Sequence, residues 1–177
     1  MKTFLHFVFG GSRSGKSRHA ESLAEASGMP VCFMATLKAT EMLDQEMRAR
    51  IDAHRERRPK HWRTMENRFD LQTQILESGN TLLLVDSVSL WLSYHLLERR
   101  APEFILGDLE TALQTALQHP RAVILVGDEV GMGVVAVTPE GRAFCDLCGA
   151  ANQLIARYAT KVEFVAAGLP WLLKGGE

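Results

Sequence analysis

Residues 3–17, TFLHFVFGGSRSGKS, join an apolar run to a glycine-rich turn, and this stretch decides the fold. The run at 3–9 is rich in aromatic and branched side chains and predicts a β-strand. The turn fits the pattern G-x-x-x-x-G-K-[ST], and residues 15–27 continue with helical periodicity until Gly28. Because strand, turn and helix follow in the required order, the stretch predicts a phosphate-binding P-loop rather than a chance glycine turn.

A P-loop binds the phosphates of a nucleoside triphosphate through backbone N–H groups and the positive end of the following helix. We expect Lys16 to reach the β- and γ-phosphates and the Ser17 hydroxyl to hold Mg²⁺. The Mg²⁺ shell also needs an acid at the end of a neighbouring strand, and TLLLVD at 81–86 ends in Asp86. Asp86 has an alternative role as the N-cap of the helix that follows it.

Strand-like and helix-like segments alternate along the chain. The strand-like runs are 3–9, 31–36, 81–86, 122–128 and 161–168, and the helical segments are 15–27, 41–57, 67–78, 87–99, 108–118 and 139–158. The runs are almost continuously hydrophobic, as is typical of a parallel sheet covered on both faces. The sequence therefore predicts one domain, residues 1–177, with an α/β fold: a mostly parallel central sheet flanked by helices, of the P-loop NTPase (RecA-like) type.

Composition excludes several classes of protein. The chain is 46% hydrophobic and its formal net charge is -1, which does not indicate disorder, general nucleic-acid binding or attraction to anionic membranes. The longest hydrophobic window, 81–97, contains Asp86, serines and His95, so we expect no membrane span. The apolar N-terminal run is too short for a signal-peptide core and leads directly into the glycine turn, and we therefore expect a cytoplasmic protein.

The three cysteines do not indicate a disulfide framework or a zinc site. Cys145 and Cys148 form a C-x-x-C within the predicted helix 139–158, without a second pair or a nearby histidine cluster. That helix has a clear start, with Thr138 as N-cap and Pro139 at its first position.

The segment 127–137, GDEVGMGVVAV, follows the predicted strand 122–128 and contains three glycines. Ligands of open α/β sheets bind at the carboxyl ends of the strands, so this segment is a candidate wall of the site. The glycines have an alternative role in tight turns alone. Asp128 and Glu129 are equally placed to orient a nucleophile or contact substrate, and the sequence does not rank them as the base of a kinase step.

The segment 46–59, EMRARIDAHRERRP, places His54 among five arginines. Helical spacing puts His54 on the same face as Leu43, Met47 and Ile51, and like-charge repulsion from Arg50 and Arg58 favours a neutral imidazole. Pro59 is expected to end the helix. A neutral imidazole is a competent nucleophile at phosphorus, with nearby arginines stabilising the transferred group. The alternative is a histidine at the edge of the core with solvated arginines.

Four stretches together resemble the bifunctional adenosylcobinamide kinase / adenosylcobinamide-phosphate guanylyltransferase family of cobalamin biosynthesis: FGGSRSGKSRHAE, LDQEMRARIDAHRERRPKHWRTME, VILVGDEVGMG and GRAFCDLCGAANQLIARYATKVEFVAAGLPWLLK. The resemblance covers nearly the whole chain. It implies phosphorylation of the aminopropanol hydroxyl of adenosylcobinamide, with GTP or ATP as donor, and then transfer of GMP from GTP to give adenosyl-GDP-cobinamide. This chain departs from the usual family pattern at Asp128, where an asparagine is common, and at Cys145, where we expect an arginine.

The resemblance also implies roles for particular residues. His54 would carry GMP as a phosphoramidate, which adds to the catalytic role expected for Lys16 and the Mg²⁺ site expected at Ser17 and Asp86 from the P-loop itself. The implied nucleotide contacts are Gly10, Gly11, Ser12, Arg13, Ser14, Gly15, Lys16, Ser17, Ala35, Thr36, Leu37, Arg55, Glu56, Arg57, Arg58, Glu66 and Asp86. The implied assembly is a homotrimer.

Two other functions fit the P-loop alone, because this motif does not define what is done with the nucleotide. One is a small-molecule kinase in which His54 is structural. The other is a switch or assembly module that hydrolyses GTP or ATP, although the guanine-reading N-K-x-D signature of switch GTPases is absent from the sequence.

Overall fold

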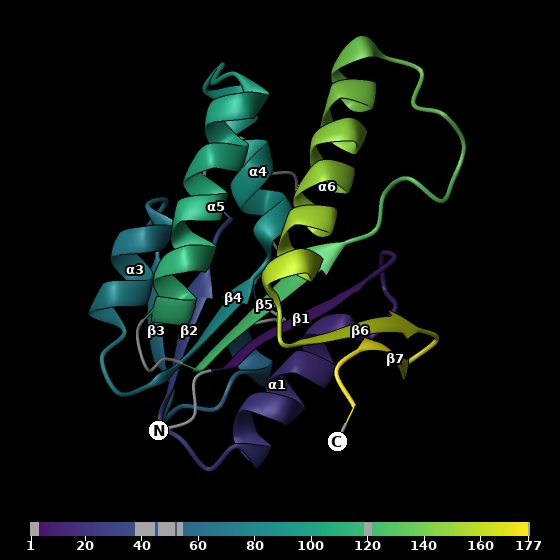
Figure 1. The fold of residues 1–177 in the computed structure, drawn as a ribbon. Helices are drawn as coiled ribbons and strands as arrows, with labels where there is room; N and C mark the ends of the chain where they lie inside the picture. Colours follow the sequence, from purple (N-terminus) through teal and green to yellow (C-terminus); the bar gives the residue numbers. More distant parts are fainter. Residues whose placement is uncertain (1–3, 38–44, 46–51, 53–54, 119–121, 177) are drawn as a thin grey trace.

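The computed structural model describes residues 4–37, 45, 52, 55–118 and 122–176. A central sheet has the strand order β3-β2-β4-β5-β1-β6-β7 (Figure 1). The strands are β1 (Phe4–Gly10), β2 (Val31–Ala35), β3 (Arg63–Glu66), β4 (Leu82–Asp86), β5 (Ala122–Asp128), β6 (Lys161–Ala166) and β7 (Leu169–Lys174). The helices are α1 (Lys16–Ala26), α3 (Leu71–Glu77), α4 (Val88–Leu97), α5 (Pro102–Gln118) and α6 (Pro139–Tyr158).

The sheet is parallel except for the pair β6–β7, which is antiparallel. Helices α3 to α6 cover one face and α1 covers the other (Figure 1). Successive side chains of a strand point to opposite faces, so Phe7 of β1 belongs to the core beneath α3–α6 and Val8 to the core beneath α1. Burial on both faces explains why the strands are continuously hydrophobic, and the predicted α/β class is confirmed.

Two strands were not predicted, and both lie at edges of the sheet. β3 has four residues, of which only Met65 is buried, so its sequence carries little apolar signal. β7 contains Pro170, a residue that argues against a strand except at an edge. The predicted strand 161–168 therefore ends at Ala166, and Ala167 and Gly168 form a turn with positive φ.

Helix boundaries differ from prediction where capping decides them. The predicted helix 67–78 begins at Leu71, because the Asp70 side chain accepts a hydrogen bond from the Thr73 N–H and so acts as the N-cap. The predicted helix 108–118 begins earlier, at Pro102, because proline fits the first turn of a helix.

The predicted helix 41–57 lies mostly outside the described residues, as do Leu43, Met47, Arg50, Ile51 and His54. Its described residues, 45, 52 and 55–57, are helical, and the helix ends before Pro59 as predicted.

Within the described part of the chain, no helix combines the length and apolar character that crossing a bilayer requires.

Candidate nucleotide site

The glycine-rich turn lies between β1 and α1, as predicted. Gly10 is the last residue of β1 and Lys16 is the first residue of α1. The turn is closed by a hydrogen bond of 3.2 Å from the Ser14 N–H to the Gly11 carbonyl. Gly15 has φ 94° and occupies the N-cap position, where the missing Cβ permits this left-handed conformation. Strand, turn and helix thus present the backbone geometry of a phosphate site, with Ser12 and Arg13 exposed and Ser17 half-buried.

The Lys16 ammonium is held inside the site. Its Nζ lies 2.6 Å from Oδ1 of Asp128 and 3.2 Å from the Gly11 carbonyl oxygen. The Lys16 side chain is 10% exposed and the Asp128 side chain 27% exposed. The Glu129 carboxylate instead accepts a 2.6 Å hydrogen bond from the Gly131 N–H in its own loop. The structure therefore distinguishes two carboxylates that the sequence left equal, since Asp128 is the one in contact with the P-loop lysine.

The turn between β6 and β7 supports the P-loop, a contact that the sequence did not indicate. The Gly168 N–H donates a hydrogen bond of 2.8 Å to the Ser14 carbonyl. A Cβ built on Gly10 would lie 2.2 Å from the Val165 carbonyl oxygen, and one built on Gly15 would lie 3.1 Å from the Gly168 Cα. The glycines of the motif therefore permit close packing against β6 as well as phosphate binding.

Residues implied as nucleotide contacts on three strands form one row of the sheet. Ala35 of β2 is paired with Glu66 of β3 on one side and with Asp86 of β4 on the other. The residue that follows β2 is Thr36, whose hydroxyl donates a 2.6 Å hydrogen bond to the Ser87 carbonyl. All these residues lie at the carboxyl ends of their strands, where α/β sheets bind ligands.

Asp86 is not the N-cap of α4. The cap is Ser87, whose side chain accepts a hydrogen bond from the Leu90 N–H, so the alternative role considered for Asp86 is wrong. Asp86 is half-buried at the end of β4. It also lies close enough to influence the pKa of Arg57 and of Arg58 electrostatically.

Two arginines that follow His54 in sequence form ion pairs, one with a glutamate of β3 and one with a glutamate of α1. Arg55 binds both carboxylate oxygens of Glu66, at 2.9 to 3.2 Å. Arg57 makes two hydrogen bonds to Glu21 of α1, of 2.8 and 2.7 Å. Hydrogen bonding to Glu21 raises the pKa of Arg57. Glu56, between the two arginines, is exposed.

Arg58 lies with its guanidinium over the Phe33 ring, 3.7 Å from the ring centroid, and donates to the Thr64 hydroxyl. Burial lowers its pKa, an effect that Glu66 and Asp86 oppose. Its Nε is buried and has no hydrogen-bond partner among the described residues. Arg58 lines a groove of about 500 Å³ together with Arg55, Lys60, Trp62 and Glu66. A buried guanidinium donor without an acceptor, beside an open groove, is suited to an anionic ligand.

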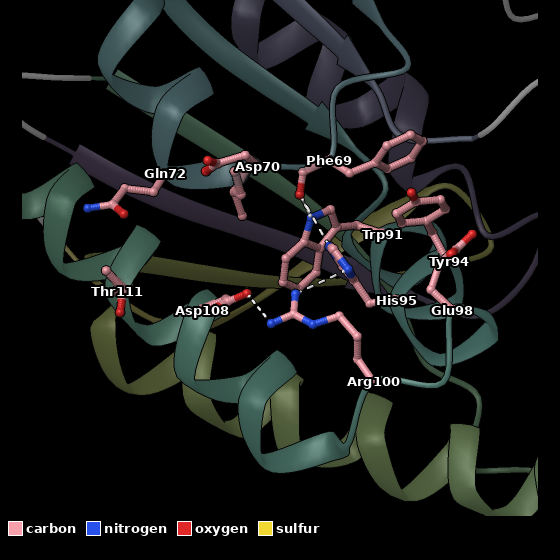
Figure 2. A pocket seen from close by; sticks show the side chains of 11 residues that line it. Phe69, Asp70, Gln72, Trp91, Tyr94, His95, Glu98, Arg100, Asp108 and Thr111 are labelled. Atoms are coloured by element: carbon pink, nitrogen blue, oxygen red, sulfur yellow. Dashed lines mark hydrogen bonds and ion pairs between the residues drawn. The ribbon is translucent and has the colours of Figure 1, made fainter.

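A second cavity, of about 550 Å³, contains none of the predicted site residues (Figure 2). It lies where the Phe69 segment meets α4 and α5. Four of its polar side chains are linked: Trp91 and His95 both lie within hydrogen-bond distance of the Phe69 carbonyl, and Arg100 contacts His95 and Asp108. Burial lowers the pKa of His95. Because these four side chains are already paired with one another or with the backbone, we assign them to stabilising the fold rather than to ligand binding.

The cysteines of α6 differ in environment. Cys148 is buried in the core, and burial raises its pKa to about 12, so its thiol stays protonated at neutral pH. Cys145 is half-buried and its Sγ lies 3.7 Å from the Val130 carbonyl oxygen. Among the residues with described positions, no group of three or more His, Cys, Asp or Glu side chains is arranged to hold a metal ion by itself.

The sheet order, the P-loop and the row of polar residues at the strand ends define a P-loop NTPase. A KaiC-like protein from Pyrococcus horikoshii OT3 shares this fold, with a TM-score of 0.50 at 16% identity, over 92% of this chain and 71% of that one. Residues 6–173 match the family described as cobinamide kinase / cobinamide phosphate guanyltransferase, and the chain belongs to this family.

Curated relatives agree with that assignment. The chain is 43% identical to the bifunctional adenosylcobalamin biosynthesis protein CobP of Pseudomonas aeruginosa, over 95% of this chain and 96% of the relative. It is 36% identical to the bifunctional adenosylcobalamin biosynthesis protein CobU of Escherichia coli K12, over 92% and 95%. The identity to CobU of Salmonella typhimurium is 35%, over the same shares of the two chains.

Proposed function

We propose that this protein phosphorylates the aminopropanol hydroxyl of adenosylcobinamide and then transfers GMP from GTP to the product, giving adenosyl-GDP-cobinamide. In the first step the hydroxyl oxygen attacks the γ-phosphorus of GTP or ATP, and the nucleoside diphosphate leaves. In the second, His54 attacks the α-phosphorus of GTP and pyrophosphate leaves. The phosphate oxygen of the cobinamide phosphate then displaces His54 from the guanylyl group.

The main support for the proposal is the contact between the arginine segment, residues 55–58, and α1, the helix that follows the P-loop. Glu21, which binds Arg57, lies one helical turn after Ser17 on α1. A segment that begins one residue after His54 is therefore fixed beside the helix that starts at the phosphate site. His54 itself is outside the described residues, and its role rests on this neighbourhood and on family membership.

Arg58 supplies a second support. Within the described part of the chain its buried Nε has no acceptor, and a phosphate oxygen of bound nucleotide would satisfy it. Arg55 and Arg57 are each paired with a carboxylate, which fixes their guanidinium groups before a ligand arrives. Fixed cationic groups beside the transferred phosphorus stabilise charge that develops in the transition state.

We further propose Ser17 and Asp86 as the residues that hold Mg²⁺ with the triphosphate. The donor set fits, because hydroxyl and carboxylate oxygens are ligands that Mg²⁺ prefers, and Asp86 lies at the carboxyl end of β4, where α/β sheets bind ligands. The ion would neutralise charge on the phosphates. Asp86→Asn should raise the Mg²⁺ concentration needed for half-maximal turnover by about tenfold or more, with little change in nucleotide binding measured in EDTA. Unchanged Mg²⁺ dependence would remove Asp86 from this role.

We also propose a cytoplasmic homotrimer. An apolar surface on β7 supports self-association, because Leu169, Trp171, Leu172 and Leu173 are 44 to 72% exposed. The loop before α6 adds Met132, Val134, Val135 and Val137, each at least 79% exposed. Exposed apolar groups of this extent mark protein interaction sites.

Labelling with [α-³²P]GTP tests the transferase step. We expect an acid-labile, base-stable adduct on the protein, which His54→Ala abolishes and which the matched variant His61→Ala retains. No protein label is expected from [γ-³²P]GTP. If the adduct persists without His54, the nucleophile is elsewhere.

The same preparations separate the alternative functions. A small-molecule kinase would phosphorylate cobinamide without any protein–GMP species. A switch module would hydrolyse nucleotide at a rate that cobinamide does not change.

A further inference from the structure

The ion pair between Lys16 and Asp128 occupies the place where nucleotide phosphates are expected. Lys16 is the motif lysine, and its ammonium lies 2.6 Å from a carboxylate oxygen of Asp128. This is a short charge-assisted contact. With the ammonium largely shielded from water and also bound to the Gly11 carbonyl, it has few donors left for phosphate oxygens unless the Asp128 contact opens.

The backbone of Asp128 is fixed from several sides. Asp128 is paired with Gly10, the first residue of the P-loop, in the register of β5 and β1. Its N–H donates to the Ser89 hydroxyl at 2.7 Å, and its carbonyl accepts from the Asn152 side chain at 3.1 Å. The second carboxylate oxygen receives a weaker contact, of 3.4 Å, from the Ser87 hydroxyl. The backbone of β5 therefore places the Asp128 carboxylate beside the P-loop. The strongest contact of the carboxylate itself is the one with Lys16.

We propose that Asp128 is a positioning residue that acts through Lys16. Its carboxylate binds the Lys16 ammonium when no nucleotide is bound, and the β- and γ-phosphates of a nucleoside triphosphate displace it. This inference rests on the nucleotide site of the proposed function. Two effects follow from the geometry. Binding must break the ion pair, and the released carboxylate then faces the polyphosphate with like charge. Both effects weaken the binding of triphosphates, whereas GMP, which lacks β- and γ-phosphates, leaves the pair intact.

Asp128→Asn tests the inference, because it keeps the side-chain shape and removes the charge. We would measure the Kd of a non-hydrolysable GTP analogue and of GMP by calorimetry, with Mg²⁺ present. Loss of a partly exposed ion pair should tighten triphosphate binding by about three- to tenfold and change GMP binding by less than about twofold. The gain should shrink at high ionic strength, because salt screens the repulsion.

A double-mutant cycle identifies the partner. In a Lys16→Ala background, Asp128→Asn should tighten triphosphate binding less than in the wild-type background, because the ion pair is already absent and only the like-charge repulsion remains to be relieved. Glu140→Gln, which removes an exposed carboxylate from the first turn of α6, is the control variant and should leave the Kd unchanged. Asp128→Ser provides a second neutral variant if the amide disturbs folding, as judged by thermal unfolding.

Unchanged or weaker triphosphate binding in both neutral variants would overturn the inference, and weaker binding would place Asp128 among the groups that bind nucleotide or Mg²⁺. An equal gain for GMP would also overturn it, since that result would reflect general charge rather than Lys16. Failure of the wild-type protein to bind the triphosphate at all would instead contradict the proposed function.

Discussion

The guanidinium of Arg57 and the carboxylate of Glu21 are joined by two hydrogen bonds, of 2.8 and 2.7 Å, across 36 positions of sequence. Glu21 is 11% exposed at the side chain and lies on the helix that begins with the P-loop lysine. The pair therefore connects the two halves of the proposed transferase site: the segment that follows His54 and the segment that binds phosphates.

Glu21→Gln should slow guanylylation of the protein by about tenfold, because a charge-assisted bidentate pair contributes on the order of 1–3 kcal/mol to fixing the arginine segment. The measurement is the rate of protein labelling from [α-³²P]GTP. Glu25→Gln, an exposed change on the same helix, is the matched control and should leave the rate unchanged. An undiminished rate in Glu21→Gln would show that the pair does not organise the transferase step.

Gly10→Ala should lower the free energy of unfolding by about 1–3 kcal/mol, because the added Cβ would lie 2.2 Å from the Val165 carbonyl and force β1 and β6 apart. Gly11→Ala is the matched control. Apart from its own chain neighbours, no atom of the described residues lies within 4 Å of the Cβ position of Gly11, so we expect a change within about 0.5 kcal/mol. Urea unfolding measures both, and equal stability of the two variants would contradict the packing argument.

Trp171→Glu should shift the proposed trimer toward monomer, because it places a charge in the middle of the apolar β7 surface. Light scattering coupled to size-exclusion chromatography measures the change in mass. Leu97→Glu, at an 80% exposed position at the end of α4, is the control and should leave the mass unaltered. A wild-type monomer would refute the assembly, and a trimer retained in Trp171→Glu would exclude β7 as its interface.

The Glu163 cluster should make the protein sensitive to acid. The carboxylate of Glu163 lies within 2.9 Å of His6, His19 and Lys161. Burial raises the pKa of Glu163, but hydrogen bonds from Lys161 and His19 and the electrostatic effect of His6 outweigh it and lower that pKa to about 2. Since the folded pKa is below the unfolded value, the stabilisation is complete above about pH 4.5 and is lost as the pH falls toward 2.

Glu163→Gln should therefore lower the unfolding free energy at neutral pH by roughly 2–3 kcal/mol and flatten its decline in acid. Burial also lowers the pKa of His6, so part of the wild-type stability should already disappear as the pH falls below about 6.5. Denaturant unfolding at a series of pH values measures both effects. An acid branch as steep in Glu163→Gln as in the wild type would assign the sensitivity to other groups.

Local patterns allowed much of the fold to be predicted. The strands β1, β2, β4 and β5 are buried on both faces, so their sequences are continuously apolar. The N-terminal cap of α6, Thr138 followed by Pro139, is likewise a local signal, and it is confirmed by the hydrogen bond from the Gly141 N–H to the Thr138 hydroxyl. Among the edge strands, β3 has only Met65 buried and so carries little apolar signal, whereas β7 is apolar but contains Pro170, which argues against a strand away from a sheet edge.

The sequence by itself determined the α/β class, the P-loop and its boundaries, and the presence of a histidine among arginines, because each depends on residues that are neighbours along the chain. Tertiary structure alone decided that Arg57 pairs with Glu21, that the β6–β7 turn supports the P-loop, and that Asp128 rather than Glu129 contacts Lys16. These contacts join segments that are distant in sequence, and their partners depend on strand order and on side-chain direction. Strand order and side-chain direction cannot be deduced from the local spacing of residues along the chain.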